Sequence, residues 1–166
     1  MKAKKAAFYG VALALSLAVS YIEYLIPVMP ALPSAKLGIA NVMFIFLIIN
    51  GKFKDACIIN FLRIVLSSLL FGNVSSFIYS LSGAILAFAI MLLLSKFSNF
   101  GFVGISCAAG ALHNIGQLAA AMLLLDSSAV ISYLPYLIAV GGFCGALTGI
   151  LAFFTDKYLG KKIKSL

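Results

Sequence analysis

The chain has 166 residues, of which 64% are hydrophobic and 10% are charged, and its net charge is +8. Soluble domains carry about 25% charged residues, so this composition and a mean hydropathy of +1.17 exclude a water-soluble fold and predict an integral membrane protein. Ten of the eleven lysines lie at the chain ends or in short breaks between apolar runs, which excludes the continuous basic face of a nucleic-acid-binding protein.

Six apolar segments follow one another along the chain, and each predicts a membrane-spanning helix. A span needs about 20 apolar residues, and helix is expected because an open strand edge in lipid leaves backbone groups unpaired. The second segment is the shortest, and no long linker separates the six, so we expect one all-α domain over residues 1–166. The segments cover about residues 6–26, 37–49, 56–71, 76–94, 102–125 and 133–154.

The first segment also has features of a secretory signal peptide. It follows a lysine-rich start and contains "AVS" near its end. Because the rest of the chain is equally apolar, we expect it to be the first transmembrane helix instead.

The lysines predict the orientation of the chain. Lysine and arginine are enriched in the cytoplasmic loops of membrane proteins. With six spans and a cytoplasmic N-terminus, Lys36 alone lies outside, and both termini are cytoplasmic. The ten lysines of the inner side are Lys2, Lys4, Lys5, Lys52, Lys54, Lys96, Lys157, Lys161, Lys162 and Lys164.

The third segment carries Arg63, the only arginine of the chain, near its middle. Asn60, Arg63 and Ser67 are spaced by three and four residues, so they share one helix face. An arginine at the bilayer centre costs several kcal/mol, with estimates from about 3 to above 10. We therefore expect this face to be turned towards the interior of the bundle or towards a water-filled cavity.

Other polar residues fall at similar or more outward depth in three further segments. His113 and Gln117 lie one turn apart in the fifth, and Asn114 points about 100° away. Glu23 lies in the outer third of the first, and Asn41 in the outer half of the second, just after Lys36.

These residues predict one polar cavity that is open to the outside or occluded just beneath it and that favours an anion. The proposed ligand-binding set is Arg63, His113, Gln117, Asn114, Asn60, Glu23, Lys36 and Asn41. The basic members suit a negatively charged group. Two alternatives remain: Arg63 pairs only with Glu23 and pins two helices, or the amides and His113 are interhelical hydrogen-bond partners worth about 1 kcal/mol each.

Small residues recur at four-residue spacing in the first and last segments. Gly10, Ala14 and Ala18 continue a ridge that starts at Ala6 and predict a partner interface. A second ridge, at residues 141, 145 and 149, is better explained by packing within the bundle.

No catalytic or metal-binding constellation is present. The four acidic residues are scattered, and neither an HExxH zinc motif nor a P-loop occurs. We expect no enzyme activity, no metal and no cofactor in this chain. An intramembrane enzyme using His113 and Glu23 is the weakest alternative, because no paired acid and nucleophile are seen.

Three stretches resemble a known family. "AKLGIANV", "LRIVLSSLLFGNVSSF" and "LHNIGQL" are similar to heptaprenyl diphosphate synthase component I, also labelled Gx transporter, and the resemblance extends from about residue 21 to residue 154. It implies a multipass protein of the bacterial plasma membrane that works with a prenyl-diphosphate synthase.

The same family resembles the substrate-binding S components of energy-coupling-factor (ECF) transporters. That resemblance implies a six-helix bundle that binds a small anionic, isoprenoid-related or quinone-related molecule. It further implies docking, through the ridge with Ala14 and Ala18, on a transmembrane coupling subunit driven by two cytoplasmic ATPases. The alternative is a non-catalytic membrane subunit that anchors a soluble synthase in isoprenoid or menaquinone synthesis.

Overall fold

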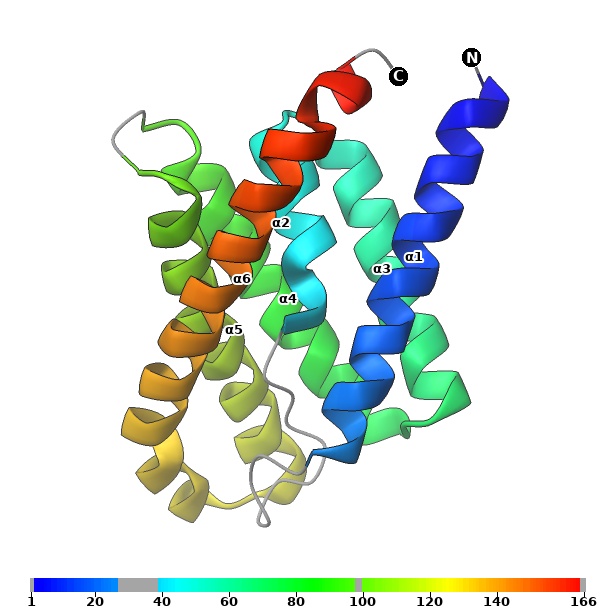
Figure 1. Cartoon of the computed structure of the whole chain (residues 1–166). Coiled ribbons are helices and arrows are strands. Elements are labelled where there is room, and N and C mark those ends of the chain that lie inside the picture. Colours follow the sequence, from blue (N-terminus) through cyan, green and yellow to red (C-terminus); the bar gives the residue numbers. More distant parts are fainter. Residues whose placement is uncertain (1, 27–38, 98–99, 165–166) are drawn as a thin grey trace.

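The computed structural model describes residues 2–26, 39–97 and 100–164, and within these ranges it contains helices and no β-strand. The all-α prediction is therefore confirmed. Each predicted segment overlaps one α-helix, and two short 3₁₀ helices precede α2 and α6 (Figure 1). The elements are α1 (Lys2–Leu25), η1 (Ile39–Asn41), α2 (Val42–Ile49), α3 (Phe53–Leu70), α4 (Val74–Leu94), α5 (Phe102–Leu125), η2 (Ser128–Tyr133) and α6 (Leu134–Lys164).

The ends of α1 and α6 extend past the predicted spans. α1 begins at Lys2 and α6 continues to Lys164, beyond the predicted end at residue 154. Apolar composition marks only the part of a helix that lies in hydrocarbon, whereas backbone hydrogen bonding continues into the polar region.

The short helix α2 lies in the middle of the bundle. It contacts α1, α3, α4, α5 and α6, and Figure 1 shows it enclosed by the longer helices. Five consecutive side chains, residues 44–48, are buried, as expected for a helix that is apolar on all sides. Its eight residues extend about 12 Å, well short of the hydrocarbon thickness of about 30 Å.

The end of α2 is fixed by a glycine in the left-handed region. Gly51 has φ +74°. Its N–H donates to the Ile48 carbonyl at 2.9 Å, and the Lys52 N–H donates to the Leu47 carbonyl at 2.9 Å. This pair of bonds is a Schellman motif, which satisfies carbonyls at the end of the helix and turns the chain into α3.

α4, α5 and α6 pack at very short distances through glycines. A Cβ atom on Gly145 would lie 2.3 Å from the Ser106 carbonyl oxygen, and one on Gly116 would lie 2.7 Å from the Ser82 carbonyl oxygen. Gly141 and Gly149 make similar approaches to α5. The predicted role of the 141–145–149 ridge in packing within the bundle is therefore confirmed.

Many large apolar side chains point away from the bundle. Leu69 and Leu123 are 77% and 84% exposed, which suits a surface solvated by lipid. Among the described residues, four helices are long and apolar enough to cross a membrane: α1, α4, α5, and η2 continued by α6. α3 has 18 residues but carries Lys54, Asp55 and Arg63, so the six-span topology stays a prediction.

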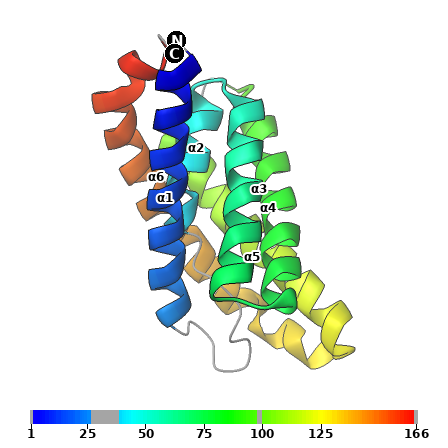
Figure 2. The ribbon, with the colours of Figure 1, turned by 90° about the vertical axis from the view of Figure 1, so that its right-hand side faces the viewer.

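The lysine-bearing segments gather at one end of the bundle. Figure 1 shows the start of α1, the end of α6, the connection between α2 and α3, and the end of α4 at the same end. Figure 2 shows the same grouping after a quarter turn, with α1 beside α3. The arrangement agrees with the predicted grouping of lysines on one side.

Candidate functional site

Arg63 lies in the interior of the bundle and is held by three neutral side chains. Its side chain is 5% exposed. Nε and Nη2 donate to Asn60 Oδ1 at 3.1 and 2.8 Å, Nη2 also donates to Asn41 Oδ1 at 2.9 Å, and Nη1 donates to Ser20 Oγ at 3.2 Å. The cluster of Arg63, Asn60, Asn41 and Ser20, here called the arginine cluster, joins α1, η1 and α3.

The arginine cluster contains no carboxylate in direct contact with the guanidinium. Within the described ranges, the one salt bridge joins Lys5 and Asp55. Glu23 is buried at 3% exposure and acts on Arg63 electrostatically. Direct pairing of Arg63 with Glu23, the alternative to a ligand role, is not among the salt bridges of the described residues, and the two charges interact electrostatically.

Ser20 is a member of the cluster that the sequence analysis missed. Ala12, Ser16 and Ser20 follow four-residue steps along α1, and all three are buried. That spacing places them on one face. The four-residue spacing of these residues could have predicted this buried face from the sequence. The prediction for this helix rested instead on the neighbouring ridge of small residues.

His113 and Gln117 form a second polar group on α5. The His113 Nε2 and Gln117 Nε2 atoms are 2.8 Å apart, as their one-turn spacing predicts. The imidazole lies against α4, where a Cβ atom on Gly83 would come within 2.9 Å of its Nδ1 and Cε1 atoms. Gly83 therefore provides the space that the ring occupies.

Asn114 is turned towards α6. Its Nδ2 donates to the Leu137 carbonyl oxygen at 2.8 Å. Asn114 is thus an interhelical hydrogen-bond partner, which was the alternative to ligand binding for this residue. Its Oδ1 atom is buried without a partner within the described ranges.

A small cavity lies between η1, α2, α4, α5 and α6, with both polar and apolar residues in its lining. It has a volume of about 10 Å³, and its lining includes Asn41, Ser106 and Thr148. The Ser106 Oγ atom is buried and has no partner among the described residues. The cavity is about large enough for one water molecule.

Five of the eight predicted site residues fall into two hydrogen-bonded sets. Arg63, Asn60 and Asn41 come together in the arginine cluster, and His113 and Gln117 pair on α5. Lys36 lies outside the described residues. The single outward cavity joining both sets stays a prediction.

The small-residue ridge of α1 is exposed, and its first two residues border a groove between α1 and α3. Ala6, Gly10, Ala14 and Ala18 are all exposed, and a Cβ atom on Gly10 would meet nothing within 4 Å. The ridge is therefore available for a contact outside this chain, unlike the glycine ridge of α6.

Groups suited to metal binding or disulfide formation are not brought together in the described ranges. No cluster of three or more histidine, cysteine or acidic residues is present there. The three cysteines are free, with Cys57 exposed and Cys144 buried.

Comparison with known proteins gives one match. The family model described as heptaprenyl diphosphate synthase component I matches residues 12–155. No curated protein matches the chain, and no solved structure does. The match includes all members of the arginine cluster and both members of the His113–Gln117 pair. The chain therefore belongs to the heptaprenyl diphosphate synthase component I family.

Proposed function

We propose that this chain is a membrane-embedded binding subunit that captures a small anionic molecule, isoprenoid-related or quinone-related, for uptake. In this proposal a transmembrane coupling subunit and cytoplasmic ATPases supply the energy, as in ECF transporters. The observation that carries it is the buried charge of Arg63, which is hydrogen-bonded by neutral groups alone within the described ranges.

A buried cation needs compensation. Removing a charge from water costs several kcal/mol, and neutral oxygens recover only part of that cost. The Nη1 group carries two N–H donors, of which one donates to Ser20. An anionic ligand can accept a hydrogen bond from the second donor and bring a negative charge into direct contact with the guanidinium, which Glu23, acting electrostatically, does not do.

The pair on α5 supports directional recognition. His113 and Gln117 are both buried, and an imidazole and an amide offer donors and acceptors to a ligand's oxygens. We propose that they contact the part of the ligand distant from Arg63.

The test of the ligand site is native mass spectrometry of the full-length purified chain with a panel of small anionic and isoprenoid compounds. We expect one compound to bind the wild-type chain, Arg63→Met to abolish binding, and Arg63→Lys to weaken it at least about tenfold, because lysine lacks the planar fork. Lys96→Met serves as the control, since Lys96 is exposed. Thermal unfolding of each variant checks that the fold persists. Unchanged affinity in Arg63→Met removes Arg63 from the site.

The partner complex is tested separately on the ridge of α1. We expect Ala14→Leu to leave thermal unfolding unchanged, because the side chain is exposed, and to reduce co-purification of a coupling subunit and ATPases. Leu15→Met, a change at an exposed neighbouring position, is the control.

A second candidate is a non-catalytic membrane subunit that anchors a prenyl-diphosphate synthase. The family description is compatible with this candidate, since it names component I of such a synthase. Co-purification of a soluble synthase in place of ATPases supports this candidate against the first.

A further inference from the structure

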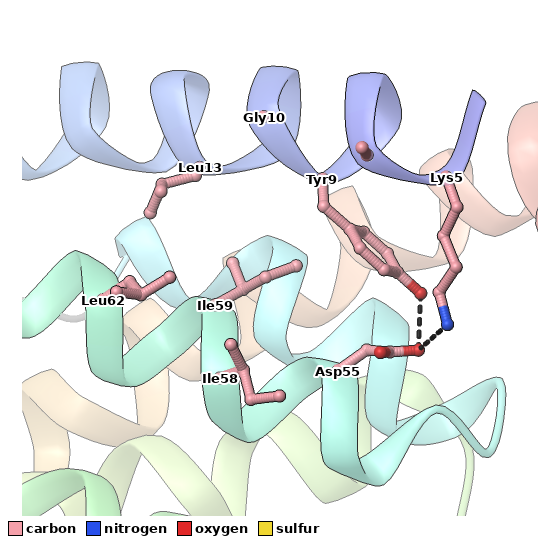
Figure 3. A pocket seen from close by; sticks show the side chains of 9 residues that line it. Lys5, Tyr9, Gly10, Leu13, Asp55, Ile58, Ile59 and Leu62 are labelled. Atoms are coloured by element: carbon pink, nitrogen blue, oxygen red, sulfur yellow. Dashed lines mark hydrogen bonds and ion pairs between the residues drawn. The ribbon is translucent and has the colours of Figure 1, made fainter. Parts of the chain in front are cut away.

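A groove of about 420 Å³ runs between α1 and α3, near the end of the bundle where the lysines lie. Figure 3 shows side chains of α1, among them Tyr9 and Leu13, directed towards α3. Its size lies within the range of about 300–1,000 Å³ that is usual for small-molecule sites. The lining residues that carry the argument are Lys5, Gly10, Leu13, Asp55, Ile58 and Leu62.

The walls of the groove are apolar and open sideways. Ile58 and Leu62 are 59% and 41% exposed, and Gly10 leaves open space where a side chain would stand. In a chain that lies in a membrane, this opening faces the lipid tails. An acyl chain in the groove would contact both α1 and α3.

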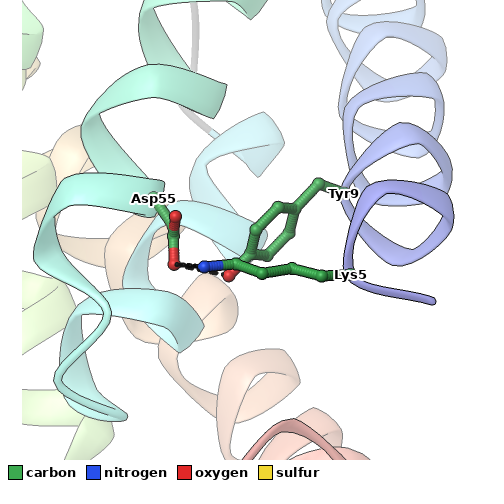
Figure 4. A network of polar contacts seen from close by, with 3 residues as sticks. All are labelled: Lys5, Tyr9 and Asp55. Atoms are coloured by element: carbon green, nitrogen blue, oxygen red, sulfur yellow. Dashed lines mark hydrogen bonds and ion pairs between the residues drawn. The ribbon is translucent and has the colours of Figure 1, made fainter. Parts of the chain in front are cut away.

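One end of the groove is polar. Lys5 Nζ lies 3.2 Å from Asp55 Oδ2, and the Tyr9 hydroxyl donates to the same oxygen at 2.5 Å. The ammonium also lies 5.4 Å from the centre of the Tyr9 ring. Figure 4 shows Lys5 and Tyr9 reaching from α1 towards Asp55 on α3. Asp55 thus fixes the position of the Lys5 ammonium.

The polar end has an excess of positive charge. Asp55 balances one lysine, whereas Lys4, Lys52 and Lys54 lie next to these residues in α1 or near the start of α3. Lys52 acts on Asp55 electrostatically. Lys5 is 40% exposed, and an ammonium has three donors, so it can donate to an external acceptor as well as to Asp55.

We propose that this groove binds an anionic phospholipid, with one acyl chain between α1 and α3 and the phosphate at Lys5. The groove opens towards the lipid tails, and Lys5 lines it where further lysines supply an excess of positive charge. Arg63 does not line the groove, so the proposal goes beyond the ligand site proposed above and stands independently of it.

The head-group test uses native mass spectrometry of the full-length chain in detergent, titrated with phosphatidylglycerol or phosphatidylcholine of equal chain length. We expect phosphatidylglycerol to bind about fivefold more tightly, as a partly exposed ion pair is worth up to about 1 kcal/mol. Lys5→Gln should remove the preference, Lys5→Arg should keep it, and Lys96→Gln should leave it unchanged as the matched control.

The groove test uses Ile58→Trp, which fills the space from α3. We expect this variant to weaken binding of both lipids, whereas Leu70→Trp, at a 68% exposed position of the same helix, should not.

Equal binding of the two lipids by the wild-type chain, or equal effects of Lys5→Gln and Lys96→Gln, overturns the proposal. So does Lys5-dependent binding of farnesyl diphosphate without a phosphatidylglycerol preference. Because Arg63→Met should retain the lipid preference, failure here is distinguishable from failure of the Arg63 site.

Discussion

Arg63 combines a permanent charge with a buried position, and its surroundings show how the bundle holds it. Three helical elements each contribute an oxygen atom, from Ser20, Asn41 and Asn60. Asn60 accepts two of the four hydrogen bonds because it lies one turn before Arg63 on the same face. The remaining two bonds require other parts of the chain to pack against that face.

The stability of the arginine cluster is testable through its amides. Asn60→Leu removes the acceptor of two hydrogen bonds, and Asn41→Leu removes the acceptor of one. A buried charged donor left without an acceptor costs about 2 kcal/mol or more. We expect Asn60→Leu to lower the free energy of unfolding by about 3 kcal/mol and Asn41→Leu by about half as much.

Denaturant titration in detergent micelles measures both losses. In an Arg63→Met background the donors are gone, so Asn60→Leu should cost less than about 1 kcal/mol. An equal cost in the two backgrounds would show that these hydrogen bonds contribute no stability.

At the scale of the helices, glycine decides which pairs pack most closely. The approaches between α5 and α6 involve backbone atoms on both sides, as at Gly110 and Gly141. In lipid, helix association depends on van der Waals contact and on interhelical hydrogen bonds more than on the hydrophobic effect. The glycine contacts therefore stabilise the α4–α5–α6 part of the bundle and position His113 against α4.

Two neighbouring glycines of α6 give a matched test of this packing. A Cβ atom on Gly145 would lie 2.3 Å from a backbone oxygen, whereas one on Gly142 would make an ordinary contact of 3.5 Å with Cys107 Sγ. We expect Gly145→Ala to lower the free energy of unfolding by about 1–3 kcal/mol through overpacking. Gly142→Ala should change it by less than about 0.5 kcal/mol or raise it slightly. Denaturant unfolding in micelles is the measurement, and equal behaviour of the two variants contradicts the packing argument.

At the scale of the whole molecule, positive charge is distributed unevenly along the bundle axis. The helix ends that carry lysine lie together (Figure 1), and the turn at η2, between α5 and α6, lies at the opposite end. Lysine clusters of this kind remain on the cytoplasmic side during insertion. The orientation of the chain follows from this asymmetry as a prediction.

Cysteine labelling on intact cells tests the orientation. In a background lacking Cys57, Cys107 and Cys144, we expect Ser128→Cys to react with a membrane-impermeant maleimide from outside. Lys96→Cys should react only after the membrane is permeabilised. Both positions are exposed in the fold, so a difference reports the side of the membrane. Labelling of Lys96→Cys in intact cells reverses the predicted topology.

The sequence by itself determined the helices and the contacts made within one helix. Apolar runs require helix because lipid offers no partner for backbone groups, and three- and four-residue spacing brought Arg63 to Asn60 and His113 to Gln117. Only the tertiary structure decided that Ser20 and Asn41 complete the arginine cluster and that α2 lies buried in the centre. The physical reason is that spacing fixes neighbours along one helix, whereas neighbours between helices depend on how all the helices pack at once.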